Sequence, residues 1–247
     1  ALILDMDGVL WRDTEQLGNL PDIFERIKNL GLKVVFATNN ATRDETKYIE
    51  KLNTFGIEAI PEQIVNSSIA TAMTLQKEYP DGGSVYLIGE KGLENILGRY
   101  GFQHGEENVK CVVVGMDRWV TYEKMSNAAL LIQKGIPFYG TNPDKSFPTP
   151  EGQTIGTGAI LAAIEAATDI PPIVCGKPFP HMMRLALDRM NVSPQETLVV
   201  GDRYETDILG GINANCVTAL VLSGVTPRDA VKGLKPQPDF VYPDLNT

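Results

Sequence analysis

The stretch LDMDGVLW, from Leu4 to Trp11, places two carboxylates two residues apart, directly after an apolar run. The run ALILDM has the composition of a buried β-strand, and Gly8 is typical of the turn that ends it. Carboxylates that are held a few ångströms apart repel each other. A bound cation would offset this repulsion, so Asp5 and Asp7 are the first candidate site residues.

The composition is that of a soluble globular protein, and it excludes several classes of partner. The chain has 247 residues, of which 43% are hydrophobic and 21% charged. Its net charge is −9 and it has no basic cluster, which argues against a nucleic-acid partner or an anionic membrane surface. No apolar run approaches the roughly 18 residues that a membrane span needs.

The cysteines and the start of the chain bear on location. Cys111, Cys175 and Cys216 lie far apart without metal-binding spacing, so we expect reduced thiols in a reducing compartment. The chain begins directly in a strand-like run, without a signal peptide pattern. We therefore expect a cytoplasmic protein.

Short apolar runs alternate with amphipathic segments along the chain, which predicts an α/β fold. The near-continuous apolar run LKVVFATNN, residues 32–40, is typical of a strand that is buried on both faces. The segment 20–30 has its apolar residues on one helical face, and Gly31 follows as a stop signal. The pattern predicts a doubly wound parallel sheet.

The middle of the chain predicts a second, smaller α/β domain. Its strand-like runs lie at residues 83–89, 111–116 and 137–142, with helical stretches between them. Pro171 and Pro172 cannot continue the helix before them, so we place a boundary there. We predict a discontinuous core, residues 1–69 and 174–247, with residues 70–173 as an inserted domain.

The chemically reactive residues fall at the ends of predicted strands. Asp5 and Asp7 end the first run, Thr38 and Asn39 end the second, and Asp202 ends TLVVGD. In open parallel sheets the carboxyl ends of the strands face the ligand crevice. We therefore expect these groups to converge in one place, together with Lys177, which precedes Pro178 at the start of a helix.

Carboxylates that converge around a small volume indicate Mg²⁺, a hard cation that prefers oxygen ligands. The only histidines, His104 and His181, are not near this set, so zinc is not expected. Mg²⁺ binds and neutralises phosphate oxygens in phosphoryl-transfer sites.

The segments DMDGV, Thr38-Asn39, Gly176-Lys177-Pro178 and GDRYETD resemble, in order, the four motifs of the haloacid dehalogenase (HAD) superfamily. The insertion between the second and third motifs resembles the large α/β cap (C2-type) of the NagD-like, or 4-nitrophenylphosphatase-like, branch. The resemblance implies a Rossmann-like HAD core that carries this cap.

The resemblance also implies roles in catalysis. Asp5 would be the nucleophile that forms an aspartyl-phosphate, and Asp7 would be the general acid and then the general base. Thr38, with the amides around Asn39 and Asn40, would hold the phosphoryl oxygens. Lys177 would bind substrate and balance the charge of nucleophile and phosphate.

The resemblance implies a metal site and a substrate-contacting loop as well. Asp5, the backbone carbonyl of Asp7, and Asp202 would ligate Mg²⁺, with Asp207 as an outer or water-mediated partner. The cap loop from Thr141 to Gly152 would help to select the leaving group, and its candidates for substrate contact are Asn142, Asp144 and Lys145.

These inferences predict a Mg²⁺-dependent phosphatase that acts on small phosphorylated metabolites, with a homodimer through the cap as one expected assembly. Hydrolysis of pyrophosphate or of a phosphoramide is an alternative reaction for the same site. A catalytically silent phosphometabolite-binding protein is a further alternative, disfavoured because nucleophile, acid, lysine and metal carboxylates are all present.

Overall fold

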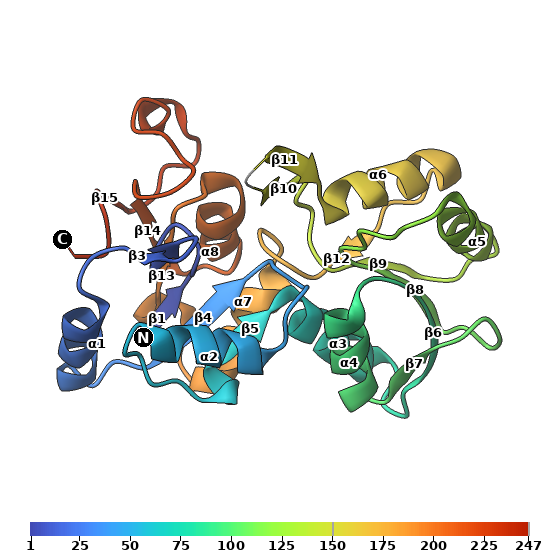
Figure 1. The fold of residues 1–247 in the computed structure, drawn as a ribbon, viewed down its shortest axis with the longest axis horizontal. Coiled ribbons are helices and arrows are strands. Elements are labelled where there is room, and N and C mark those ends of the chain that lie inside the picture. Colours follow the sequence, from blue (N-terminus) through green and yellow to red (C-terminus); the bar gives the residue numbers. More distant parts are fainter. Residues whose placement is uncertain (150, 247) are drawn as a thin grey trace. The chain divides into compact units, whose positions relative to one another are not determined.

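Two units, each built on its own sheet, make up the chain in the computed structural model (Figure 1), which describes residues 1–149 and 151–246. The first unit comprises Ala1–Thr38, Glu45–Val65 and Lys177–Thr247. The second comprises Asn39–Asp44 and Asn66–Gly176, whereas the sequence placed its limits at residues 70 and 173.

The sheet of the first unit has six strands in the order β15-β14-β13-β1-β4-β5. The four pairings from β15 to β4 are parallel, and Leu4 lies opposite both Phe36 and Val200. The strands are β1 (Leu2–Leu4), β4 (Val34–Thr38), β5 (Ile64–Asn66), β13 (Leu198–Gly201), β14 (Val217–Val221) and β15 (Phe240–Tyr242). This parallel sheet confirms the predicted α/β fold class.

Helices cover both faces of this sheet. Leu4 and Phe36 pack in one core with residues of α1 and α2, while Leu220 packs on the other side with Ile208. The helices of this unit are α1 (Leu20–Asn29), α2 (Glu45–Thr54), α7 (Pro180–Met190) and α8 (Leu209–Asn213). Three short 3₁₀ turns complete it: η1 (Pro61–Gln63), η2 (Pro194–Glu196) and η4 (Val231–Gly233).

Two features of the first unit were not predicted. A two-stranded hairpin, β2 (Trp11–Arg12) with β3 (Glu15–Gln16), follows the DMDG turn directly. After Asp202 the chain forms a π-helix, η3 (Tyr204–Ile208), which leads directly into α8. The π-helix has a wider turn than an α-helix and is frequent at functional sites.

The second unit contains a five-stranded parallel sheet in the order β12-β9-β8-β6-β7. Its strands are β6 (Gly83–Ile88), β7 (Phe102–His104), β8 (Cys111–Val114), β9 (Phe138–Gly140) and β12 (Ile173–Val174). Its helices are α3 (Ser67–Glu78), α4 (Lys91–Arg99), α5 (Tyr122–Gln133) and α6 (Thr157–Thr168). The predicted boundary between residues 173 and 174 falls within β12, and the chain returns to the first unit at Lys177.

The proline-containing loop expected at Thr141–Gly152 is largely a hairpin in the structure. Its strands are β10 (Ser146–Thr149) and β11 (Gly152–Ile155), and Pro150 lies outside the described residues. No helix within residues 1–149 and 151–246 has both the length and the apolar character that crossing a membrane requires.

Candidate active site

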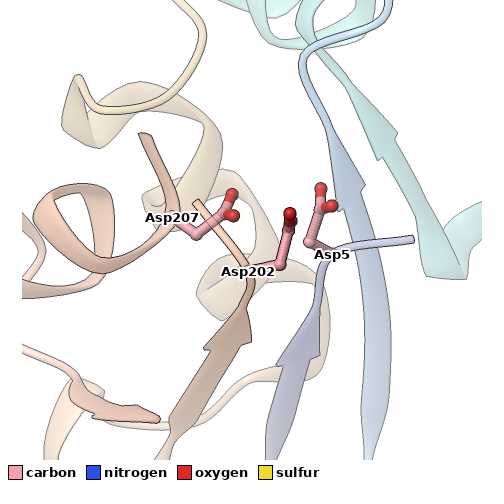
Figure 2. Close-up of side chains that lie close together, drawn as sticks. All are labelled: Asp5, Asp202 and Asp207. Carbon is pink, nitrogen blue, oxygen red and sulfur yellow. The ribbon is translucent and has the colours of Figure 1, made fainter. Parts of the chain in front are cut away.

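Three carboxylates meet at the carboxyl ends of adjacent strands in the first unit (Figure 2). Asp5 follows β1, Asp202 follows β13, and Asp207 lies in the π-helix η3. One oxygen from each carboxylate lies within 4.8 Å of the others. Because β1 and β13 are neighbours in a parallel sheet, their last residues open on the same edge, and this brings Asp5 and Asp202 together.

Lys177 neutralises part of this cluster. Its Nζ lies 2.5 Å from Oδ1 of Asp5 and 2.6 Å from Oδ1 of Asp207, and it donates a hydrogen bond of 2.9 Å to the carbonyl of Ala37. The lysine side chain is 3% exposed. An ammonium has three N–H donors, and these three acceptors satisfy them in a buried place.

The buried charges shift one another's protonation. Burial raises the pKa of Asp5 well above its usual value, with Asp207 and Asp202 adding to the rise and Lys177 opposing it. Burial together with Asp207 raises the pKa of Asp202 to about 6. Burial lowers the pKa of Lys177, but Asp207 and Asp5 outweigh it and hold that pKa above its usual range. Lys177 alone therefore does not offset the cost of ionising both Asp5 and Asp202 in this buried place.

The backbone around Asp202 is shaped to admit a carboxylate and little else. Gly8 has a φ of +88°, and a Cβ there would lie 2.5 Å from Cγ of Asp202. A Cβ on Gly224 would lie 1.9 Å from Oδ2 of Asp202, and Val225 N–H donates to the same oxygen at 2.6 Å. Glycine is needed at both positions because the main chain approaches the carboxylate so closely.

The cluster fits Mg²⁺ by the chemistry of its donors. All three side chains offer carboxylate oxygens, the ligands that hard divalent cations prefer. Burial is the main cause of the raised pKa of Asp5 and Asp202, and a divalent cation would offset the carboxylate repulsion that adds to it. Asp5, Asp202 and Asp207 are therefore the residues that could hold the metal.

Within the part of the chain that the structure describes, the side chain of Asp7 does not belong to this carboxylate cluster. Its Oδ1 accepts a hydrogen bond of 2.7 Å from Nε1 of Trp11 and lies 3.9 Å from Nζ of Lys51. The side chain is 59% exposed. The proposed ligation of Mg²⁺ through its backbone carbonyl stays a prediction.

The predicted phosphate-binding residues are divided between the two units. Thr38 ends β4 in the first unit and is buried, and the preceding carbonyl, of Ala37, is an acceptor for Lys177. Asn39 and Asn40 belong to the second unit. There Oδ1 of Asn40 accepts hydrogen bonds from the backbone N–H and the hydroxyl of Thr42.

Two of the three predicted loop residues contact Asn39 within the second unit. Nδ2 of Asn142 donates to the carbonyl of Asn39 at 2.9 Å, and Nδ2 of Asn39 lies 3.4 Å from Oδ1 of Asp144. Lys145 is exposed. The loop residues that were candidates for substrate contact therefore also fix the conformation of Asn39.

Sequence reasoning missed three features of the site. Trp11 was not among the predicted site residues, and Lys51 on α2 was not considered. The segment from Ser223 to Val225, which wraps Asp202, was not noticed either. Its one signal in the sequence is Gly224, which follows directly after a strand-like run.

Comparison with known proteins identifies the family. Residues 2–103 match the family of haloacid dehalogenase-like hydrolases, and residues 174–247 match a second family described as HAD-hydrolase-like. The chain is 36% identical, over 247 residues, to an acid sugar phosphatase of Staphylococcus saprophyticus, covering all of this chain and 95% of that protein. The chain belongs to the haloacid dehalogenase-like hydrolases.

Solved structures place it in one branch of that family. NagD from Escherichia coli superimposes with a TM-score of 0.91 at 32% identity, covering 99% of this chain and 96% of NagD. The p-nitrophenyl phosphatase of Archaeoglobus fulgidus has a TM-score of 0.92 at 33% identity, with 99% and 95% covered. These similarities support the NagD-like branch that the insertion between the second and third motifs indicated.

One of the similar structures contains a metal. The glycerol phosphate phosphatase Rv1692 of Mycobacterium tuberculosis, solved in complex with magnesium, has a TM-score of 0.91 at 29% identity. The alignment covers 99% of this chain and 74% of that one.

Proposed function

We propose that this phosphatase of the HAD superfamily depends on Mg²⁺ and hydrolyses small-molecule phosphate monoesters through an aspartyl-phosphate. One observation carries the proposal: Lys177 bridges Asp5 and Asp207, beside Asp202, in one buried cluster. A lysine and three carboxylates at strand ends are the groups that a phosphoryl-transfer site requires.

In the first step, an oxygen of the Asp5 carboxylate attacks phosphorus. A bond forms between that oxygen and phosphorus, and the bond from phosphorus to the alcohol oxygen breaks. Asp7 gives its proton to the departing oxygen, so the alcohol leaves neutral. Lys177 favours the ionised form of Asp5, which attack requires, and its charge lies beside the developing phosphoryl charge.

In the second step, Asp7 takes a proton from water, which attacks the phosphorus of the aspartyl-phosphate. Inorganic phosphate leaves and the carboxylate of Asp5 is restored, so protons and bonds balance over the cycle. Asp5, Asp202, Asp207 and the backbone carbonyl of Asp7 would hold Mg²⁺. When bound, the ion would neutralise charge on the phosphoryl oxygens.

The remaining residues would bind the substrate. Thr38, Asn39, Asn40 and Lys177 would hold the phosphoryl oxygens. The first structural unit would be the catalytic core and the second the cap, as the sequence-based limits 1–69, 70–173 and 174–247 propose. The protein would act in the cytoplasm, and it could form a homodimer through the cap.

The substrate class rests partly on the relatives. Their names describe an acid sugar phosphatase, a p-nitrophenyl phosphatase and a glycerol phosphate phosphatase, which all act on small phosphate esters. Hydrolysis of pyrophosphate or phosphoramide bonds is the alternative reaction. A silent binding protein remains the alternative from another class.

A substrate panel tests this proposal. Phosphate release is measured from sugar phosphates, phosphoglycolate, nucleotides, pyridoxal phosphate and pyrophosphate, with Mg²⁺ and with EDTA. We expect turnover of one or more monoesters, its loss in EDTA, and its loss in Asp5→Asn without a change in fold by circular dichroism. Turnover that survives in EDTA, or in Asp5→Asn, would refute the proposed metal or nucleophile respectively.

A further inference from the structure

Asp7 is held by two residues that the reaction scheme above does not use. The indole N–H of Trp11 donates to Oδ1 of Asp7 at 2.7 Å, and Nζ of Lys51 lies 3.9 Å from the same oxygen. The other oxygen, Oδ2, accepts no hydrogen bond from the residues that the structure describes. One oxygen is therefore anchored, and the other is available for a proton.

The indole is itself rigid. Trp11 is fully buried, it lies in β2 of the hairpin, and its ring stacks on Phe55 with centroids 5.6 Å apart. Two hydrogen bonds hold the hairpin to the main chain beyond β14: Arg12 Nη2 donates to the carbonyl of Ser223 at 2.6 Å, and Ser223 Oγ donates to the carbonyl of Gly8 at 2.6 Å. These contacts fix the position of the indole, and therefore the direction of its N–H group.

Lys51 completes the arrangement from a different element. It lies in α2, and its Nζ sits 4.2 Å from the centroid of the Trp11 ring. The side chain is only 22% exposed, so its ammonium rests between the indole face and the carboxylate. A cation over an aromatic face is attracted by the ring, and a carboxylate beside it adds a second attraction.

A purely structural role for Asp7 explains its contact with Trp11 but not its contact with Lys51. A buried indole N–H needs an acceptor, and Asp7 would satisfy it without any role in the reaction. That requirement does not account for Lys51, which contacts both the ring and the carboxylate. An exposed lysine of the same helix, Lys47, pairs instead with Glu50 at the surface.

We propose that Trp11 and Lys51 are positioning residues, which together hold the carboxyl group of Asp7 in the orientation that proton transfer needs. This inference rests on the proposed function, because it assigns the proton transfers to Asp7. An exposed aspartate samples several rotamers, and proton transfer demands hydrogen-bond reach to the departing oxygen. Anchoring Oδ1 fixes the direction in which Oδ2 faces.

The test compares two substrates that differ in their need for a proton. An alkyl phosphate such as glycerol phosphate must release an alkoxide unless Asp7 protonates it, whereas 4-nitrophenolate is stable as an anion. The ratio of kcat/KM for the two substrates reports on formation of the phosphoenzyme, where Asp7 acts as acid. A general loss of structure lowers both values and leaves the ratio unchanged.

Separate variants test the contributions of Lys51 and Trp11. Lys51→Met retains the aliphatic stem and removes the charge, while Trp11→Phe retains an aromatic ring and removes the N–H donor. Lys51→Arg restores a cation at the same place, and Lys47→Met is a matched control on the same helix. Wild type and Asp5→Asn, measured in parallel, test the proposed function separately.

We expect kcat/KM for glycerol phosphate to fall about tenfold in Lys51→Met and Trp11→Phe, against less than about twofold for 4-nitrophenyl phosphate. A burst of 4-nitrophenolate should appear in both variants, because Asp7 also activates the water that hydrolyses the phosphoenzyme. Lys51→Arg should recover most of the loss, and Lys47→Met should match wild type.

Equal losses of kcat/KM for both substrates, or no loss in Lys51→Met, would overturn the positioning role. The proposed function would still stand in that case, provided that the wild type turns over and Asp5→Asn is inactive. If Trp11→Phe fails to fold, Lys51→Met alone decides the outcome. Absence of wild-type turnover on every phosphate ester would remove the proposed function, and the positioning role with it.

Discussion

Nζ of Lys177 lies 2.6 Å from Oδ1 of Asp207, and the side chains of both residues are almost completely buried. The same ammonium lies 2.5 Å from Oδ1 of Asp5, so one cation from the segment before α7 links a carboxylate after β1 to one in the π-helix. Removal of one partner from a buried ion pair leaves an uncompensated charge, which costs more than the pair itself contributes.

Replacement of Lys177 should therefore damage both stability and turnover. We expect Lys177→Met to lower the free energy of unfolding by about 3–5 kcal/mol in the absence of metal. It should lower kcat by about 10²–10³, because a positive charge beside the phosphoryl group is lost. Urea unfolding and steady-state kinetics measure the two effects, with Lys47→Met as the control. A variant with wild-type kcat would exclude Lys177 from the chemistry.

Asp7→Asn should separate metal binding from proton transfer. The Asp7 side chain lies outside the carboxylate cluster, and the proposed ligand is its backbone carbonyl. We expect the variant to keep the wild-type increase in Tm on addition of Mg²⁺, while its turnover of an alkyl phosphate falls about 10²-fold or more. Asp202→Asn is the matched comparison, and it should lose the increase in Tm. Loss of that increase in Asp7→Asn would assign its carboxylate to the metal.

Gly8→Ala should weaken the metal site through sterics alone. The new Cβ would lie 2.5 Å from Cγ of Asp202 and would displace that carboxylate. Gly31→Ala is a matched control, because it also has a positive φ, +65°, but meets no atom within 4 Å. Both variants should lose about 1–2 kcal/mol from backbone strain. Only Gly8→Ala should also require more Mg²⁺ for half-maximal stabilisation, by about tenfold or more, measured as Tm against Mg²⁺ concentration.

The stabilising effect of Mg²⁺ should depend on pH. Asp202 has a pKa of about 6 in the metal-free protein, above that of an aspartate in an unfolded chain. Between the pKa of an aspartate in the unfolded chain and about pH 6, the unfolded chain ionises this carboxyl group more readily than the metal-free folded protein does. The contribution of Asp202 to the stability of the metal-free protein therefore falls as the pH rises through this interval. Mg²⁺ binds the ionised form, so its stabilising effect should grow over the same interval.

Thermal unfolding with and without Mg²⁺ measures this dependence. At about pH 5 most Asp202 is protonated. Competition between Mg²⁺ and the proton on Asp202 should by itself weaken the apparent affinity for Mg²⁺ about tenfold relative to about pH 7.5. An increase in Tm that is equal at both pH values would contradict the raised pKa. In the absence of Mg²⁺ the Asp202→Asn variant is the control, because its stability should lack the pH-dependent contribution of Asp202.

The parts of the site that lie at the ends of apolar runs could be predicted from sequence. Asp5, Thr38 and Asp202 each follow or end an apolar run, and a parallel sheet brings the carboxyl ends of its strands to one edge. Lys177 does not end a strand, so its predicted place in the site rested on its position before Pro178 at the start of a helix and on the resemblance to a family motif. The strand-end rule says nothing about which helix supplies a cation.

Other elements gave too weak a signal to be recognised. The strands β2 and β3 have two residues each, which is too short for any periodicity to appear. The contact between Lys51 and Asp7 joins residues that are far apart in sequence, and it depends on how α2 packs on the hairpin. Such contacts follow from tertiary packing, which local patterns do not encode.

The π-helix that follows Asp202 and contains Asp207 requires a fixed number of residues between these two acids, whatever the identity of those residues. Its wide turn is closed at Asp207, whose Oδ2 accepts a hydrogen bond of 3.0 Å from the backbone of Arg203, while Oδ1 faces Lys177. Deletion of one residue here would rotate the aspartate around the helical axis, away from the ammonium. Grafts and loop exchanges in this enzyme must therefore conserve the number of residues between the two acids, even where every intervening side chain is replaced.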